Sequence, residues 1–374
     1  MLATIDAALR RGDGEEGHVM NRCKTEIVPL ARTLAIAMLA LPALTTELLA
    51  AEELPKLGAD LALTSVAGLS SGAYMAGQIQ VAHSKDIVGA GIVAGGPYAC
   101  AESAASRIFP FWPTAVAQNG TQALYQCMET SLGTPDPVAL ATRAKELAED
   151  GEIDPIAGLA ADNVYLFSGK KDDTVKLAVV QAAKRFYKEV GVDEGNTALI
   201  EGDGGHALIT AQGGGVACGV SDTPYVSNCG YNQAQAILAW IYGPLADPSV
   251  EAKGRYIPFD QGAFSDPGDG LADEGVVYVP QGCAEQDGCR VHIVLHGCQQ
   301  SREAVGDSFV KGSGFAEIAD TNRIVVLFPQ IKASTINPKG CWDWWGYTGL
   351  DYLGKDAAQI KAIWAMVERL TSAR

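Results

Sequence analysis

A serine between two glycines, placed where a strand-like stretch meets a helix-like one, constrains this chain more than any other feature. The apolar run LALTSV (61–66) leads into Gly68-x-Ser70-x-Gly72, and the following run AYMAGQIQVAHS is typical of a helix. A plain surface turn would account for one glycine and one serine only. A serine between glycines at a sharp strand-to-helix corner is displayed as a nucleophile. The corner therefore predicts nucleophilic chemistry at Ser70, provided that the chain supplies a base and an acid.

Apolar, β-branched stretches alternate with helical patterns along the rest of the chain. The strand expected over 163–169, for example, is followed by a helix expected over 174–190. This alternation predicts an α/β protein with a mostly parallel sheet covered by helices. Further strands are expected within 88–96, 197–206, 274–282, 289–297 and 323–330, and further helices within 138–150, 232–243, 307–322 and 356–370.

The N-terminus has the layout of a secretory leader. Basic residues precede the apolar run TLAIAMLALPAL (33–44), which is too short to span a bilayer comfortably, and small residues follow at Ala50 and Ala51. We expect residues 1–51 to be a leader, although an Ala-x-Ala cleavage site is lacking. Residues 1–19 are polar, so Met20 is an alternative start. The competing interpretation is an amphipathic first helix of the fold.

The formal net charge of −16 excludes a basic surface that would neutralise phosphates, so no nucleic-acid partner is expected. No membrane association is expected once the leader has been removed. The remaining sequence, 52–374, is expected to be one catalytic domain. A boundary within the Pro- and charge-rich stretch 244–254 would instead divide it into two.

Eight cysteines remain outside the leader, and an even set in an exported chain predicts disulfides. Sequence does not fix their connectivity. Spacing favours two local pairs and two longer ones: Cys283–Cys289, Cys218–Cys229, Cys100–Cys127 and Cys298–Cys341. Neither CxxC pairs nor HExxH occur, so no metal site and no cofactor are expected.

Of the five histidines, His206 has the location expected of a general base for Ser70. It lies in the flexible GDGGHA turn after a strand, further along the chain than the corner. The others lie in the leader, on the helix after the corner, within a strand or at its end: His18, His83, His292 and His296. Asp172 and Asp173 both follow the strand 163–169, and either could orient the base. The order Ser…Asp…His is that of α/β-hydrolases.

An oxyanion hole needs two backbone N–H groups, one of which should come from Ser71, the residue after the nucleophile. The second normally comes from a His-Gly loop that precedes the nucleophile. Here the motif occurs late, in VHIVLHGCQ (291–299), with Cys298 after His-Gly. Reading 274 to the C-terminus first and then continuing at residue 60 restores the usual order. The sequence therefore predicts a circularly permuted α/β-hydrolase fold.

At this point a family resemblance becomes specific. The segments GLSSGAYMA, IVAGGPYACAE, PYVSNCGYN, HGCQQS and NPKGCWDWWGYTG resemble the polyhydroxybutyrate depolymerase family, in its single-domain, circularly permuted type. The resemblance covers roughly residues 60–372. It implies a secreted serine esterase that cuts poly(3-hydroxybutyrate) into oligomers or monomer, with a polyester or oligoester as its partner. Many secreted relatives have a separate polymer-binding module, and none is visible here.

Carried over residue by residue, the family's nucleophile, acid and base fall on Ser70, Asp172 and His206, which decides between the two adjacent aspartates. The oxyanion-hole positions fall on Ser71 and Cys298.

Aromatic residues after the NPKG turn are candidates for substrate contact, because aromatic rings suit an apolar polyester chain. They are Trp342, Trp344, Trp345 and Tyr347. In an extended segment Trp342 and Trp344 would share one face. The alternative is that these rings belong to the core, and the FPFW run (109–112) is likewise expected either in a groove wall or in the core.

Other ester substrates fit the same residues. A feruloyl or acetylxylan esterase, or another carboxylesterase, would use the same nucleophile, and aromatic rings also suit sugar stacking. A hydroxybutyrate oligomer hydrolase is a further alternative, as is a non-catalytic binding protein that has kept the fold.

Overall fold

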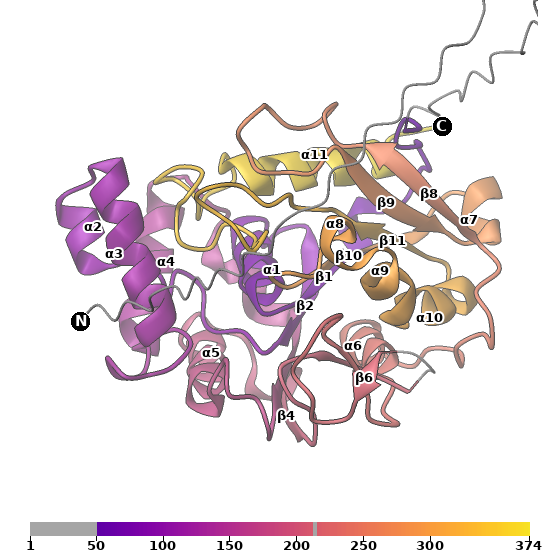
Figure 1. Ribbon diagram of the computed structural model, residues 1–374. Helices are drawn as coiled ribbons and strands as arrows, with labels where there is room; N and C mark the ends of the chain where they lie inside the picture. Colours follow the sequence, from indigo (N-terminus) through magenta and orange to yellow (C-terminus); the bar gives the residue numbers. More distant parts are fainter. Residues whose placement is uncertain (1–50, 212–214) are drawn as a thin grey trace, which may run out of the picture. The chain divides into compact units, whose positions relative to one another are not determined.

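The computed structural model describes residues 51–211 and 215–374, so the predicted leader lies outside the described residues except for Ala51. The segment from Leu49 to Arg374 forms one compact unit. Its main sheet has eight strands in the order β4-β3-β2-β1-β10-β11-β9-β8 (Figure 1). Their bounds are β1 Thr64–Leu69, β2 Ile87–Val93, β3 Asn163–Gly169, β4 Thr197–Gly202, β8 Arg255–Asp260, β9 Glu274–Val279, β10 Arg290–Leu295 and β11 Ile324–Phe328.

The strands from β4 across to β11 pair in parallel, and only β9 is reversed, pairing antiparallel with both β11 and the edge strand β8. Read from β8 to β11 and then from β1 to β4, the chain crosses the sheet from edge to edge, with only β10 and β11 exchanged. The two ends of the described chain lie next to each other, because the N–H of Leu57 donates to the carbonyl of Leu370. The fold is therefore the circularly permuted α/β-hydrolase fold predicted from the late His-Gly motif.

Helices cover both faces of the sheet. Two consecutive residues of β2 show this, because Gly91 faces Ile237 of α6 whereas Ile92 lies against Gly77 of α1. Helices α1 and α11 lie on one face, α6 and α10 on the other (Figure 1). Strand β1 is buried along its whole length, as expected of a central parallel strand. The bounds are α1 Ser71–Ala82, α6 Gln233–Tyr242, α10 Phe315–Asn322 and α11 Ala358–Thr371.

Helices α2, α3 and α4 form an excursion between β2 and β3, at the end of the unit away from β8 and β9 (Figure 1). Helix α5 follows β3 and packs on β3 and β4. A second, three-stranded sheet lies between β4 and α6 in sequence. The bounds are α2 Ala104–Ile108, α3 Trp112–Tyr125, α4 Pro137–Glu149, α5 Leu177–Glu189, β5 Leu208–Thr210, β6 Val216–Ala217 and β7 Val226–Asn228.

The single helix expected over 307–322 is wrong. The structure divides it into α9 (Ser308–Gly312) and α10, because Gly314 adopts a left-handed φ of +82° between them. Two further short helices, α7 (Gln281–Glu285) and α8 (Arg302–Val305), flank β10 in sequence. None of the helices of the described residues is long and apolar enough to cross a membrane.

All four cysteine pairs favoured by spacing are disulfides in the structure. They are Cys100–Cys127, Cys218–Cys229, Cys283–Cys289 and Cys298–Cys341. The last of these joins the loop after β10 to the aromatic segment, which are 43 residues apart in sequence. It therefore fixes two remote segments at the same edge of the sheet.

Candidate active site

Ser70 lies at the corner between β1 and α1, with a φ of 57° and a ψ of −121°. A positive φ is uncommon for a residue with a side chain, and such strained positions cluster at functional sites. The N–H of Ser70 donates to the carbonyl of Val93 on the neighbouring strand, at 2.9 Å. The corner is thus held in the strained turn that Gly68-x-Ser70-x-Gly72 predicts.

Both glycines of the motif are required by close backbone approach. A Cβ on Gly68 would lie 2.2 Å from the carbonyl oxygen of Gly72, and a Cβ on Gly72 would lie 2.3 Å from that of Leu295. These are backbone atoms that cannot move aside as a flexible side chain could. The glycines therefore let α1 begin directly against β1 and β10.

His206 and Asp172 come together from the loops after β4 and β3. The Nδ1 atom of His206 lies 2.9 Å from Oδ2 of Asp172, and both side chains are buried. The other carboxylate oxygen of Asp172 accepts from the N–H groups of Thr174 and Val175, at 2.8 and 2.9 Å. The backbone N–H of His206 donates to the hydroxyl of Ser221 at 2.7 Å. The carboxylate and imidazole are thereby held in fixed orientations.

Asp173, the alternative acid, points away from this site. Its side chain is 99% exposed and pairs with Lys176 at 3.0 Å. Geometry thus favours Asp172 as the partner of His206, in agreement with the family resemblance.

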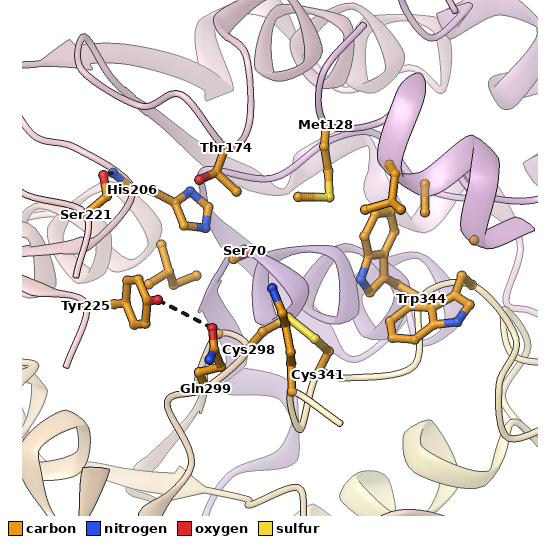
Figure 2. Close-up of a pocket in the computed structure, with 17 residues that line it drawn as sticks. Ser70, Met128, Thr174, His206, Ser221, Tyr225, Cys298, Gln299, Cys341 and Trp344 are labelled. Atoms are coloured by element: carbon orange, nitrogen blue, oxygen red, sulfur yellow. Dashed lines mark hydrogen bonds between the residues drawn. A yellow bond between two sulfur atoms is a disulfide. The ribbon is translucent and has the colours of Figure 1, made fainter. Parts of the chain in front are cut away.

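The carboxyl ends of β1, β3, β4 and β10 meet at one edge of the sheet, where ligands bind in open α/β sheets. Ser70, His206 and Cys298 all line a cavity of about 430 Å³ at this edge (Figure 2). Figure 2 shows the imidazole of His206 turned toward Ser70. In the part of the chain that the structure describes, no hydrogen bond uses the N–H of Ser71 or of Cys298. These groups are therefore available as oxyanion donors.

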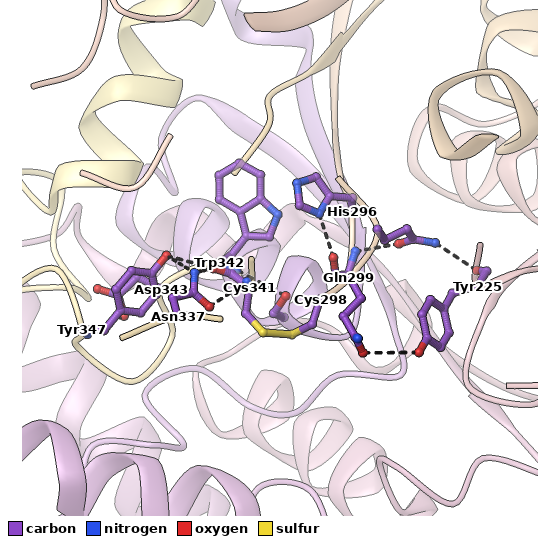
Figure 3. Close-up of a disulfide and its surroundings, with 12 residues drawn as sticks. Tyr225, His296, Cys298, Gln299, Asn337, Cys341, Trp342, Asp343 and Tyr347 are labelled. Atoms are coloured by element: carbon purple, nitrogen blue, oxygen red, sulfur yellow. Dashed lines mark hydrogen bonds between the residues drawn. A yellow bond between two sulfur atoms is a disulfide. The ribbon is translucent and has the colours of Figure 1, made fainter. Parts of the chain in front are cut away.

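The loop that carries Cys298 is held by buried polar side chains that sequence reasoning gave no role. Gln300 accepts from the N–H of Gly297 at 2.6 Å. Burial lowers the pKa of His296 to about 4, so its imidazole is neutral. Its Nε2 accepts from the N–H of Ile331 at 3.2 Å, so its Nδ1–H donates to Gly297 at 2.7 Å (Figure 3). The only available signal was their position in the HGCQQS segment.

The rings of the aromatic segment lie in two different environments. Trp344 and Trp345 line the cavity, whereas Trp342 and Tyr347 are buried behind it. The segment is not extended, so the condition for Trp342 and Trp344 to share one face is not met, because the buried carboxylate of Asp343 holds the following residues in a tight turn. It accepts from four successive backbone N–H groups, those of Trp345, Gly346, Tyr347 and Thr348 (Figure 3 shows part of this turn).

The FPFW run (109–112) does not lie in the core, so that expectation is wrong, and none of its residues lines the cavity of Ser70. The groove-wall expectation stays a prediction, and Pro110 lines a separate hollow. Phe109 and Phe111 are 69% and 67% exposed, and Trp112 is 40% exposed. The neighbouring helix α3 contributes Leu124 to the cavity, and Met128 follows in the next turn. Hydropathy alone could not separate an exposed apolar surface from a buried one.

One group away from the cavity brings possible metal ligands together. Atoms of His83, Asp86 and Asp154 lie within 4.8 Å of one another. The carboxylate of Asp154 is already paired with Lys355 at 2.9 Å and Lys85 at 3.5 Å. Since these lysines compensate its charge, we assign no ion to this group.

No family model matches the chain. A poly(3-hydroxybutyrate) depolymerase of Delftia acidovorans is 38% identical over 331 residues, which cover 86% of this chain and 62% of that protein. The chain therefore spans less than two thirds of that relative. A polyhydroxybutyrate depolymerase of Talaromyces funiculosus is 34% identical over 350 residues, which cover 89% of this chain and 96% of that protein.

Two solved structures are also similar, each covering 85% of this chain and 98% of its own at 30% identity. One is a serine-to-alanine variant of a PHB depolymerase complexed with an R3HB trimer, with a TM-score of 0.75. The other is a PHB depolymerase from Penicillium funiculosum, with a TM-score of 0.74. Sequence and fold thus agree over most of the chain, which belongs to the polyhydroxybutyrate depolymerase family.

Proposed function

We propose that this chain is a serine esterase that hydrolyses the ester bonds of poly(3-hydroxybutyrate), or of related short-chain polyesters, to oligomers or monomer. The observation that carries the proposal is the pairing of His206 with Asp172 at 2.9 Å, since His206 also lines the same cavity as the strained Ser70. The depolymerases among its relatives, one of them complexed with an R3HB trimer, support the substrate class.

The proposed mechanism uses these three side chains in sequence. His206 takes the proton of the Ser70 hydroxyl as its oxygen attacks the ester carbonyl, while Asp172 holds the imidazole tautomer. The N–H groups of Ser71 and Cys298 stabilise the oxyanion. His206 then gives its proton to the departing alcohol, and water hydrolyses the acyl-enzyme at Ser70. No metal or cofactor takes part in this scheme.

Substrate contact is proposed for the apolar wall of the cavity. Trp344 and Trp345 lie in this wall, together with Leu124 and Met128. Apolar and aromatic side chains suit the methylated backbone of a polyester, which lacks charge along its length. Trp342 and Tyr347 would act indirectly, since they are buried behind this wall.

Adsorption to solid polymer is proposed for the surface of the same domain, without a separate binding module. Exposed apolar side chains lie on α2, on α3 and in the turn between them, and one of them, Leu124, also lines the cavity. Large exposed apolar patches mark interaction surfaces. The exposed apolar side chains concerned are Ile108, Phe109, Phe111, Trp112, Leu124 and Tyr125. Replacing Phe109 and Phe111 by serine should weaken adsorption to polymer film more than it affects hydrolysis of soluble oligomers.

We further propose that residues 1–51 are a leader and that 52–374 act as a secreted, single catalytic domain. The layout of basic residues, apolar run and small residues supports this proposal. Determining the N-terminus of the exported protein tests it, and an uncleaved N-terminus would contradict it.

The activity is tested with protein that starts near residue 52, on amorphous poly(3-hydroxybutyrate) film. Soluble hydroxybutyrate oligomers and feruloylated arabinoxylan are tested alongside. Ser70→Ala serves as the blank. We expect soluble hydroxybutyrate from the film with the parent chain and none with the blank. Cleavage of oligomers without loss of film would indicate an oligomer hydrolase, and ferulate release alone would indicate a plant-polysaccharide esterase.

A further inference from the structure

The cavity contains one cationic side chain. Among the described residues that line it, Lys339 is the only lysine or arginine, and no aspartate or glutamate lines it. The other lining groups are mainly apolar or uncharged, apart from His206. An isolated cation at an otherwise uncharged cavity attracts negative ligands.

The backbone that carries Lys339 is fixed next to the proposed oxyanion hole. Its carbonyl accepts from the N–H of Gln299 at 2.7 Å, one residue after Cys298. The turn is closed by the buried Asn337, whose side-chain oxygen accepts from the N–H of Cys341 at 2.9 Å (Figure 3). The Cys298–Cys341 disulfide joins the same two segments. The exposed lysine side chain thus extends from a rigid base.

No ion pair among the described residues compensates the charge of Lys339. None of the ion pairs found in residues 51–211 and 215–374 includes it. This is notable in a chain with 44 acidic and 28 basic residues. Lys332, seven residues earlier on the same segment, pairs with Asp273 at 3.4 Å. Lys339 therefore has its charge and its three N–H donors available for a ligand.

We propose that Lys339 binds the free carboxylate of a short oligoester, so that the cavity prefers chains that end in an acid. This inference rests on the proposed esterase function and adds a substrate class to it. A polyester is uncharged along its length, and only its acid end carries a negative charge. A cation in the cavity therefore distinguishes short, acid-ended chains from internal polymer segments of the same composition.

The expected preference is modest, since Lys339 is exposed and its ion pair with the ligand would be screened by water. Exposed pairs of this kind contribute roughly 0.2–1 kcal/mol, which corresponds to a factor of about 1.4 to 5 in binding. The preference should decrease as salt is added, because exposed charges are screened over about 10 Å at 0.1 M ionic strength.

The test compares the trimer of (R)-3-hydroxybutyrate as free acid with its methyl ester, which differs only at the charged end. The measured quantity is the ratio of kcat/KM for the acid to kcat/KM for the methyl ester. We expect Lys339→Gln to lower this ratio about 1.4- to 5-fold at low salt, through KM. Lys339→Arg should retain the parent ratio. Lys332→Gln is the matched control, because it removes one charge from the same segment outside the cavity, and it should also retain the ratio.

A ratio that is equal in the parent chain and in Lys339→Gln would overturn the inference, while hydrolysis of both trimers would leave the proposed esterase function intact. An equal decrease of this ratio in Lys332→Gln would also overturn the inference, because the preference for the acid would then result from net charge and not from the cavity. Failure of the parent chain on both trimers and on film, with hydrolysis of p-nitrophenyl butyrate retained, would overturn the proposed polyester substrate and this inference with it.

Discussion

Tyr74 stacks on Trp344, with ring centroids 3.9 Å apart and planes within 9° of parallel. Tyr74 belongs to α1, which begins directly after Ser70, and Trp344 lines the cavity. The hydroxyl of Tyr74 donates to the carbonyl of Cys127, the residue that closes the disulfide with Cys100. This stack joins the helix after the nucleophile, the excursion α2–α4 and the aromatic segment into one wall of the cavity.

Removing the ring of Trp344 should therefore weaken substrate binding more than it slows chemistry. Loss of its apolar area and of the stack is worth about 1–2 kcal/mol, so we expect Trp344→Ala to raise KM for hydroxybutyrate oligomers roughly 5- to 30-fold. The value of kcat should change much less. Steady-state kinetics provide the measurement. Trp240→Ala is the control, since Trp240 lies on α6 outside the cavity, and a matching rise in KM there would contradict the prediction.

The two adjacent aspartates should differ sharply in their effect on turnover. Asp172→Asn removes the carboxylate that orients His206, and loss of this group from such a triad lowers kcat by roughly 10⁴-fold. Asp173→Asn alters only an exposed ion pair with Lys176, so kcat should stay within about two-fold of the parent value. Measurement of kcat on a soluble ester compares them. Equal losses would show that the acid has been assigned wrongly.

Two glycines near the start of α1 should respond oppositely to alanine. A Cβ on Gly72 would lie 2.3 Å from the carbonyl oxygen of Leu295, so Gly72→Ala should destabilise the fold by more than about 2 kcal/mol and disrupt the corner at Ser70. A Cβ on Gly77 would meet only Tyr187 and Ile92, at 3.8 and 3.9 Å. Gly77→Ala should therefore stabilise the helix by about 0.5–1 kcal/mol. Thermal unfolding of both variants is the test, and a destabilised Gly77→Ala would contradict the argument.

Asp162 should make the stability of the fold depend on pH. Burial raises the pKa of its carboxyl from 3.8 to about 7, and a hydrogen bond from Gln80 opposes this shift. Because the folded state then holds the proton more tightly than the unfolded state, the protonated Asp162 stabilises the fold at low pH, relative to its ionised form. Its contribution is complete below about pH 4 and is lost as the pH rises through 7, by on the order of 4 kcal/mol in total.

The substitution Asp162→Asn removes this titration and keeps an acceptor for Gln80. We expect the melting temperature of the variant, relative to the parent, to rise between pH 5 and pH 8. Thermal unfolding at the two pH values measures this difference, in which all other titrating groups cancel. A difference that does not change with pH would show that the carboxyl ionises at an ordinary pKa.

Patterns that are local in sequence determined the fold and most of the candidate site. Strand and helix periodicity gave the order of elements, and the late His-Gly motif predicted the permutation that the sheet order confirms. The strained turn at Ser70 could be predicted because it depends on neighbouring residues, with glycine at two positions where backbone atoms touch. His206 and Asp172 could be paired because parallel strands end at one edge of the sheet.

Contacts between remote segments decided the rest. Periodicity could not show that Trp344 lines the cavity while Trp342 lies behind it, because the division results from the turn around Asp343. Nor could it show that Phe109 and Phe111 are exposed, since an apolar side chain has the same hydropathy in a core and on a surface. Lys339 lies beside the cavity because a disulfide and a backbone hydrogen bond hold its segment against the loop after β10. Sequence determines which side chains are present and their local geometry, and only the packing of distant loops decides which of them share a cavity.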